Sequence, residues 1–181
     1  MQSFANHFLV AMPSLHNNEF AGALVYVSEH SASSGAVGVV VNRPVGRSLK
    51  NVFNNLDMES YNPSWINYPL FWGGPVSTDR GYVLHRCVSN VEHMLEISND
   101  KDVLAEVAKS PFKNNLLMTV GYSSWDELQL EEEVRRNDWL IVKANLDLVF
   151  EIDPVNRHAE ALKMLGIASV ARLYAGGDVI A

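Results

Sequence analysis

The chain has 181 residues and combines 48 % apolar with 19 % charged residues, at a formal net charge of −7. That length suits one domain with a sizeable core. A charged fraction below the roughly 25 % of an average domain favours a partly covered surface, for instance in a homo-oligomer. The acidic balance disfavours direct nucleic-acid binding, because neutralising phosphates requires clustered lysines and arginines.

The cysteine content and the apolar patterning both favour the cytoplasm. Cys87 is the single cysteine, so no intramolecular disulfide can form and a reducing compartment is expected. The start of the chain lacks the basic region of a secretory signal. No apolar run approaches the roughly 20 residues that span a bilayer. We therefore expect a cytoplasmic protein without a membrane-spanning segment.

The first half of the chain is rich in strand-like segments. Its apolar runs predict strands at 7–12, 21–30 and 36–43. The small residues of 31–35 predict a hairpin between the last two strands. Ser48 precedes apolar residues at helical spacing, so we expect it to cap a short helix. Residues 57–69, with two prolines, are expected to form a loop.

The second half mixes strands with helices. Its apolar runs predict strands at 70–74, 81–86, 91–98, 116–122, 139–142 and 146–151. Asn99 is expected to cap one helix. Ser124 would cap another, with Glu127 completing a capping box. The pair Asp153–Pro154 is typical of a helix start, and Gly166 of the end of that helix.

These elements do not alternate as in a doubly wound sheet, and they predict the α+β class. We expect a single domain over residues 1–181, with a C-terminal helical segment at about 154–175.

The helix predicted to begin at Ser124 carries two polar residues flanked by apolar ones. Gln129 and Glu133 are four residues apart and therefore neighbours on the helix surface. The opposite arc is expected to face solvent and holds Glu127, Glu131 and Arg135. If the flank of Gln129 and Glu133 packs inward, both polar groups need partners.

Two interpretations of this polar pair stay open. Gln129 and Glu133 could cap or staple neighbouring backbone. Alternatively, they line a shared site with His30, Asn42 and Arg43. Arg43 is then the candidate partner of Glu133, because its planar guanidinium suits carboxylates.

Glycine and turn residues supply weaker candidates. Asn42 precedes a turn and is commonly structural there. Gly73 and Gly74 allow close backbone approach, where an anionic group could bind, although structural turns explain them better. Gly35 and Gly38 form neither a P-loop nor a dinucleotide fingerprint.

Metal and catalytic motifs are missing from the sequence. The six histidines are dispersed, and His85 with Cys87 is the only close pair of soft ligands. No serine lies in a G-x-S-x-G elbow. Glu29 and His30 are adjacent in a strand and would point to opposite faces. The sequence therefore nominates no metal, no cofactor and no catalytic residue.

Several short sequence blocks follow one another along the chain, and their order and spacing together are specific for one family. They are FLVAMPSL from Phe8, SEHSASSGAVGVVVNRP from Ser28, GGPV from Gly73, RGYVLH from Arg80, and GYSSWDELQLEEEV from Gly121. In these blocks the chain resembles the AlgH family of small bacterial proteins, also called YqgE-like. The resemblance extends from Phe8 to about Gly166.

The resemblance implies a fold but no particular reaction. The implied fold is α+β, with a bifurcated, barrel-like sheet flanked by helices. The family name implies an association with transcription of alginate biosynthesis genes, without a mechanism. The matched polar positions are Glu29, His30, Asn42, Arg43, Arg80, His85, Gln129, Glu131 and Glu133, and the framework positions are Gly73, Gly74, Gly121, Tyr122 and Trp125.

The chain departs from the family pattern in two places. Asp126, Glu127 and Leu128 stand where small residues are usual, which is expected to narrow a cleft near Gln129. The C-terminus reads AGGDVIA instead of ending in Gly-His-Ala, so no role is expected for it.

We therefore expect a non-catalytic cytoplasmic protein that binds a small molecule or a protein partner and acts in regulation. The candidate ligand-binding residues are His30, Asn42, Arg43, Gly73, Gly74, Arg80, His85, Gln129 and Glu133. The alternative is an enzyme that uses His30 or His85 with Glu133 in a polar cleft. A DNA-binding regulator is disfavoured by the charge balance.

Overall fold

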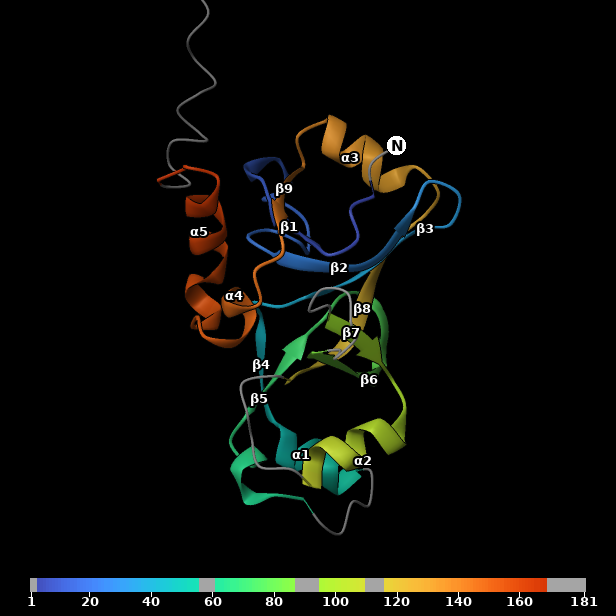
Figure 1. Cartoon of the computed structure of the whole chain (residues 1–181), viewed down its shortest axis with the longest axis vertical. Coiled ribbons are helices and arrows are strands. Elements are labelled where there is room, and N and C mark those ends of the chain that lie inside the picture. The colour runs from blue at the N-terminus through green and yellow to red at the C-terminus, as the bar shows by residue number, and fades with distance from the viewer. Residues whose placement is uncertain (1–2, 56–60, 87–94, 110–115, 169–181) are drawn as a thin grey trace, which may run out of the picture.

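The computed structural model describes residues 3–55, 61–86, 95–109 and 116–168. In this part of the chain, nine strands form one mixed sheet that does not close, and helices cover it from outside (Figure 1). The predicted α+β class is confirmed. The main path of the sheet runs β4-β5-β8-β3-β2-β1-β9, and β6 and β7 branch from β8.

The upper part of the sheet in Figure 1 is antiparallel. Its strands are β1 (His7–Ala11), β2 (Leu24–Ser31), β3 (Gly35–Val40) and β9 (Trp139–Lys143). The predicted hairpin is confirmed, with His30 of β2 opposite Ala36 of β3. Phe8 and Leu9 belong to different core clusters, so β1 is buried on both faces. That burial accounts for its continuous apolar sequence.

The lower part holds the remaining strands and two helices around a core of its own. Its elements are β4 (Pro44–Ser48), α1 (Leu49–Asn55), the short 3-10 helix η2 (Pro63–Trp65), β5 (Pro69–Trp72), β6 (Val76–Arg86), β7 (Leu95–Ser98) and α2 (Lys101–Lys109). The predicted helix after Ser48 is confirmed. The helix predicted at Asn99 is also present, but Asp100 caps it by accepting the amide of Asp102. The predicted loop and the strand at 91–98 lie partly outside the described residues.

Strand β8 (Leu116–Trp125) joins the two parts. Its first half pairs with β6 and with β5, the latter in parallel, and Ser123, Ser124 and Trp125 pair with β3. Between Val76 and Gly81 the register of β6 on β8 shifts. Residues 77–80 of β6 thus stand opposite the single residue Gly121 of β8, as a bulge.

The helices after β9 cover one face of the upper sheet (Figure 1). They are α4 (Asp147–Phe150) and α5 (Pro154–Met164). The start at Asp153–Pro154 is confirmed, and Gly166 follows the helix at φ +76°. The strand predicted at 146–151 is wrong, because Leu148, Val149 and Phe150 are all buried in a short helix. Residues 169–181 lie outside the described chain.

The capping box at Ser124 is also wrong. The backbone of Ser124 and Trp125 is paired with β3, so these residues extend β8 and cannot begin a helix. The chain turns at Leu128, which has φ 61°, and α3 (Gln129–Arg135) follows. Leu128 is 42 % exposed and points away from the interior.

Candidate ligand-binding site

Glu133 holds α3 to the sheet. Its Oε2 accepts hydrogen bonds from the indole nitrogens of Trp125 and Trp139, each at 2.8 Å. Its Oε1 accepts from Nε2 of Gln129 at 2.9 Å, and Oε1 of Gln129 accepts the amide of Asp126. Both polar side chains form hydrogen bonds with neighbouring protein groups. The geometry favours the structural interpretation of this pair.

Arg43 does not contact Glu133, so the predicted pairing is wrong. Its guanidinium donates to the carbonyl oxygens of Glu19 and Ala21 and lies 5.2 Å from the ring centre of Trp72. Burial lowers the pKa of Arg43, and Glu19 partly offsets this. Phe20 explains the separation, because its ring contacts Trp72 on the Arg43 side and the two tryptophans that bind Glu133.

His30 contacts a carboxylate that the sequence analysis placed in solvent. Its Nδ1 accepts the amide of Phe4 at 3.0 Å, and its Nε2 lies 3.2 Å from Oε1 of Glu131. Because Nδ1 accepts, the ring proton of a neutral His30 resides on Nε2, facing the carboxylate. The two side chains are only 2 % and 7 % exposed. Neither oxygen of Glu131 has an aligned hydrogen bond within the described chain.

The exposed face predicted for Glu131 is therefore wrong. The helix begins at Gln129 instead of Ser124, so the arcs assigned from a longer helix do not apply. Glu131 lies in the first turn of α3, directly over β2.

The other sequence candidates lie at separate places. Asn42 ties a turn by accepting the amide of Leu24 and donating to the carbonyl of Gly22. Gly73 and Gly74 pack against the backbone of β8, where an added Cβ would collide with main-chain atoms. His85 on β6 lies 4.0 Å from Glu96 on β7. Cys87 is outside the described residues.

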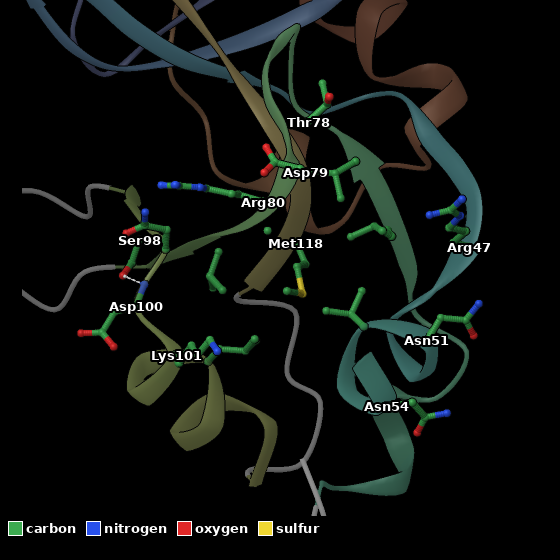
Figure 2. Close-up of a pocket in the computed structure, with 17 residues that line it drawn as sticks. Arg47, Asn51, Asn54, Thr78, Asp79, Arg80, Ser98, Asp100, Lys101 and Met118 are labelled. Carbon is green, nitrogen blue, oxygen red and sulfur yellow. Dashed lines mark hydrogen bonds between the residues drawn. The ribbon is translucent and has the colours of Figure 1, made fainter. Parts of the chain in front are cut away.

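A cavity in the lower part is lined by Arg80 and by none of the other candidates. It encloses about 900 Å³ between α1, α2 and the strands β6 and β8 (Figure 2). A second, shallower hollow of about 490 Å³ includes Asn42 and Arg43. The nine candidate residues therefore do not line one common cavity.

The floor of the large cavity is apolar and belongs to the core of the lower part. Its buried members are Leu70, Val83, Leu104 and Met118, none more than 5 % exposed. Figure 2 shows Met118 at the centre of this floor. The half-buried Val52 and Val120 also line the cavity and offer apolar surface to a ligand.

The rim of the cavity is polar and carries both signs of charge. Its charged members are Arg47, Asp79, Arg80, Asp100 and Lys101. In Figure 2, Asn51 and Arg47 line one wall, and Ser98 and Asp100 line the opposite one. Lys101 lies in the first turn of α2, on the same side of the cavity as Asp100.

The bulge in β6 builds part of this rim. Thr78, Asp79 and Arg80 belong to the segment that leaves the ladder opposite Gly121. Ser77 adopts φ 50° and Gly121 φ 70°, both in the left-handed region. Bulges of this kind often re-aim side chains next to functional sites.

Two further features concern metals and membranes. Across the four described stretches of chain, no three His, Cys, Asp or Glu side chains gather closely enough to hold a metal ion. None of the helices in those stretches has the length and apolar character needed to cross a bilayer.

The sequence analysis missed most cavity residues because they lie in ordinary polar stretches. Thr78 and Asp79 precede the RGYVLH block, and Asp100 and Lys101 look like a normal helix start. Only the polar run directly before a buried strand could have drawn attention to the bulge.

Comparison with known proteins shows the family. Residues 8–170 match the family model described as AlgH-like, and the chain belongs to this family. A UPF0301 protein from Dechloromonas aromatica is 37 % identical over 172 residues, which are 92 % of each chain. A UPF0301 protein from Bordetella petrii is 38 % identical over 179 residues, covering 96 % of this chain and 88 % of the relative.

Solved structures show the same fold. The solution structure of the AlgH protein from Pseudomonas aeruginosa superposes with a TM-score of 0.76 at 34 % identity, covering 96 % of this chain and 94 % of that one. A crystal structure of a Corynebacterium diphtheriae protein superposes with a TM-score of 0.69 at 19 % identity, a likeness of fold alone.

Proposed function

We propose that this protein is a non-catalytic, cytoplasmic regulatory factor that binds a small molecule in the cavity between α1 and α2. The observation that carries the proposal is the cavity, whose volume of about 900 Å³ lies within the roughly 300–1,000 Å³ of small-molecule sites. Its buried apolar floor and its polar rim match the usual lining of such sites. Any influence on transcription would then be indirect, through a protein partner.

An enzymatic reaction has less support. The proposed alternative needs His30 or His85 to work with Glu133, but the carboxylate of Glu133 is engaged by two indoles and Gln129. His30 is enclosed beneath Phe4 and α3, where a substrate has no access. Nucleic-acid binding remains disfavoured by the net charge of −7.

Gly81 allows a direct test of the cavity. A Cβ added at this position would meet the flexible end of Met118 at 3.2 Å and no other atom closer than 3.9 Å. Gly81 lines the cavity, so Gly81→Leu should obstruct it beside Met118 without straining the backbone. Gly46 on β4 has nothing within 4 Å of an added Cβ and does not line the cavity, so Gly46→Leu is the matched control.

The experiment is a thermal-shift screen of a metabolite library against the wild type and both variants. We expect at least one compound to raise the melting temperature of the wild type and of Gly46→Leu but not of Gly81→Leu. The proposal fails if every stabilising compound acts equally on Gly81→Leu, or if none stabilises the wild type.

A further inference from the structure

Resting on the proposed function, we infer that the cavity binds a small anionic amphiphile, with a carboxylate or phosphate head on an apolar body. The inference depends on three features of the cavity: its cations, its carboxylates and its floor. Each can be traced to described residues.

The cations of the rim have no carboxylate partner in the described chain. Arg47, Arg80 and Lys101 are exposed and take part in none of the ion pairs formed among the described residues. Elsewhere in the described chain, Arg136 and Lys163 each pair with an acid one turn or less away. Cations grouped around a concave surface without such partners raise the local concentration of anions.

The carboxylates of the rim do not cancel this charge. Asp100 uses Oδ1 to accept the amide of Asp102 at the start of α2, which leaves Asp79 as the rim acid without a hydrogen bond in the described chain. Three cations and two carboxylates line the cavity, in a chain whose net charge is −7. This local excess of positive charge runs against the overall balance.

The floor requires that the ligand also carry apolar surface. The half-buried Val52 and Val120 line the cavity together with the buried Leu70, Val83 and Met118, and they leave apolar surface open to it. A purely polar ion, such as inorganic phosphate, would leave this surface uncovered. An apolar body resting on it gains about 25 cal/mol for each Å² removed from water. Head and body together fit a rim of cations above an apolar floor.

The test uses the full-length protein and four probes in isothermal titration calorimetry. Octanoate and octyl phosphate carry an anionic head on the same chain, octylamine reverses the charge, and acetate removes the chain. We expect the two anionic amphiphiles to bind and octylamine and acetate to bind at least tenfold more weakly. The tighter of the two anionic probes assigns the head as carboxylate or phosphate.

Variants locate the binding. Arg80→Gln and Lys101→Gln should each weaken the tighter probe about fivefold, the loss expected for one charged contact. Lys109→Gln, at the other end of α2 and away from the cavity, should change it less than twofold. Gly81→Leu, which obstructs the cavity beside Met118, should also weaken binding. Because these cations are exposed, their loss should leave the melting temperature unchanged.

Three results would overturn the inference: octylamine binding as tightly as octanoate, Lys109→Gln weakening binding as much as Lys101→Gln, or no binding of either anionic probe. If neither anion binds but a library compound gives a shift that depends on Gly81, the ligand class is wrong and the proposed function stands. If no compound depends on Gly81, both fail.

Discussion

The region around α3 and the region around α1 and α2 treat polar side chains in opposite ways. Around α3, inward-facing polar groups contact other protein groups: Glu133 accepts from two indoles and from Gln129. Around the cavity, Arg80 and Lys101 face open space without a carboxylate partner in the described chain. Polar residues set among apolar ones here serve the fold, whereas exposed charges on a concave rim are the better candidates for binding.

That contrast follows from the cost of burial. A buried polar group without partners is destabilising; in the upper part Glu133 is matched with hydrogen-bond donors, and the buried Glu131 lies against His30. Exposed charges on the rim stay hydrated, so they cost the folded protein little free energy when no ligand is bound. Substitutions in the upper part should therefore change stability, and substitutions on the rim should change binding.

Gly121→Ala should have the largest effect, because it alters the junction of the two regions. Gly121 has φ +70°, and an added Cβ would collide with the carbonyl oxygens of Gly74 and Val76. We expect a loss of about 4 kcal/mol in unfolding free energy, from backbone strain and overpacking together. Urea denaturation measures it. Gly46→Ala, with nothing within 4 Å of the new Cβ, should lie within about 0.5 kcal/mol of the wild type.

Glu133→Ala should come next, with a loss of about 3 kcal/mol, since it leaves the indole donors of Trp125 and Trp139 without their charged acceptor. The exposed neighbour Glu132 offers the control Glu132→Ala, for which little change is expected. Chemical denaturation of the two variants decides the point. Equal stabilities would mean that Glu133 is not structural, and the contrast between the regions would break down.

Glu131→Gln should have a smaller effect, within about 1 kcal/mol in either direction. The buried carboxylate contacts His30 but has no aligned hydrogen bond within the described chain. A glutamine of the same shape removes the cost of burying a charge, and its carbonyl oxygen still presents an acceptor to Nε2 of a neutral His30, so little net change is expected. Thermal unfolding of Glu131→Gln, with Glu132→Gln as the control, provides the measurement. A loss above about 2 kcal/mol would show that the contact of the carboxylate with His30 is strongly stabilising.

Alkaline pH should reveal the smallest effect, at the side chain that links the two cores. Tyr68 packs against the core cluster that contains Phe71 and against the one that contains Trp65. Burial raises the pKa of Tyr68 above 10.0, and the charge of Arg157 offsets this only in part. Folded Tyr68 thus keeps its proton to higher pH than the unfolded chain. Its contribution to stability is complete below pH 10 and declines as the pH rises through the folded pKa.

Urea denaturation between pH 9 and pH 11 tests this dependence. Tyr68→Phe has no proton to lose, so its stability should decline less steeply above pH 10 than that of the wild type. Tyr26, whose pKa burial also raises, remains in the variant and keeps part of the slope. Identical slopes would contradict the assignment to Tyr68.

Helices and strands were largely predictable where sequence signals within a few residues determine them. The hairpin of β2 and β3, the helix after Ser48 and the start of α5 at Asp153–Pro154 all follow from turn residues, spacing and caps. Predictions were wrong where pairing partners overrode local signals. Ser124 looks like a helix cap, but β3 was available to pair with it.

The candidate site was less predictable than the fold. Gln129 and Glu133 were correctly placed as interacting neighbours, but Arg43 was wrongly assigned as their partner, because Phe20 and the tryptophans could not be foreseen between them. Arg80 was a candidate because it begins the RGYVLH block. Its companions Arg47 and Lys101 carry no local signal, since only tertiary packing brings β4 and α2 to one cavity.

The sequence by itself determined the class of the fold, the family and most of the strands, because periodicity and turn chemistry act over a few residues. The tertiary structure alone decided that Glu131 is buried against His30, that Glu133 binds indoles, and that rim cations stand above an apolar floor. Those outcomes depend on which distant segments meet. Contacts between distant segments are set by global packing, which no local pattern encodes.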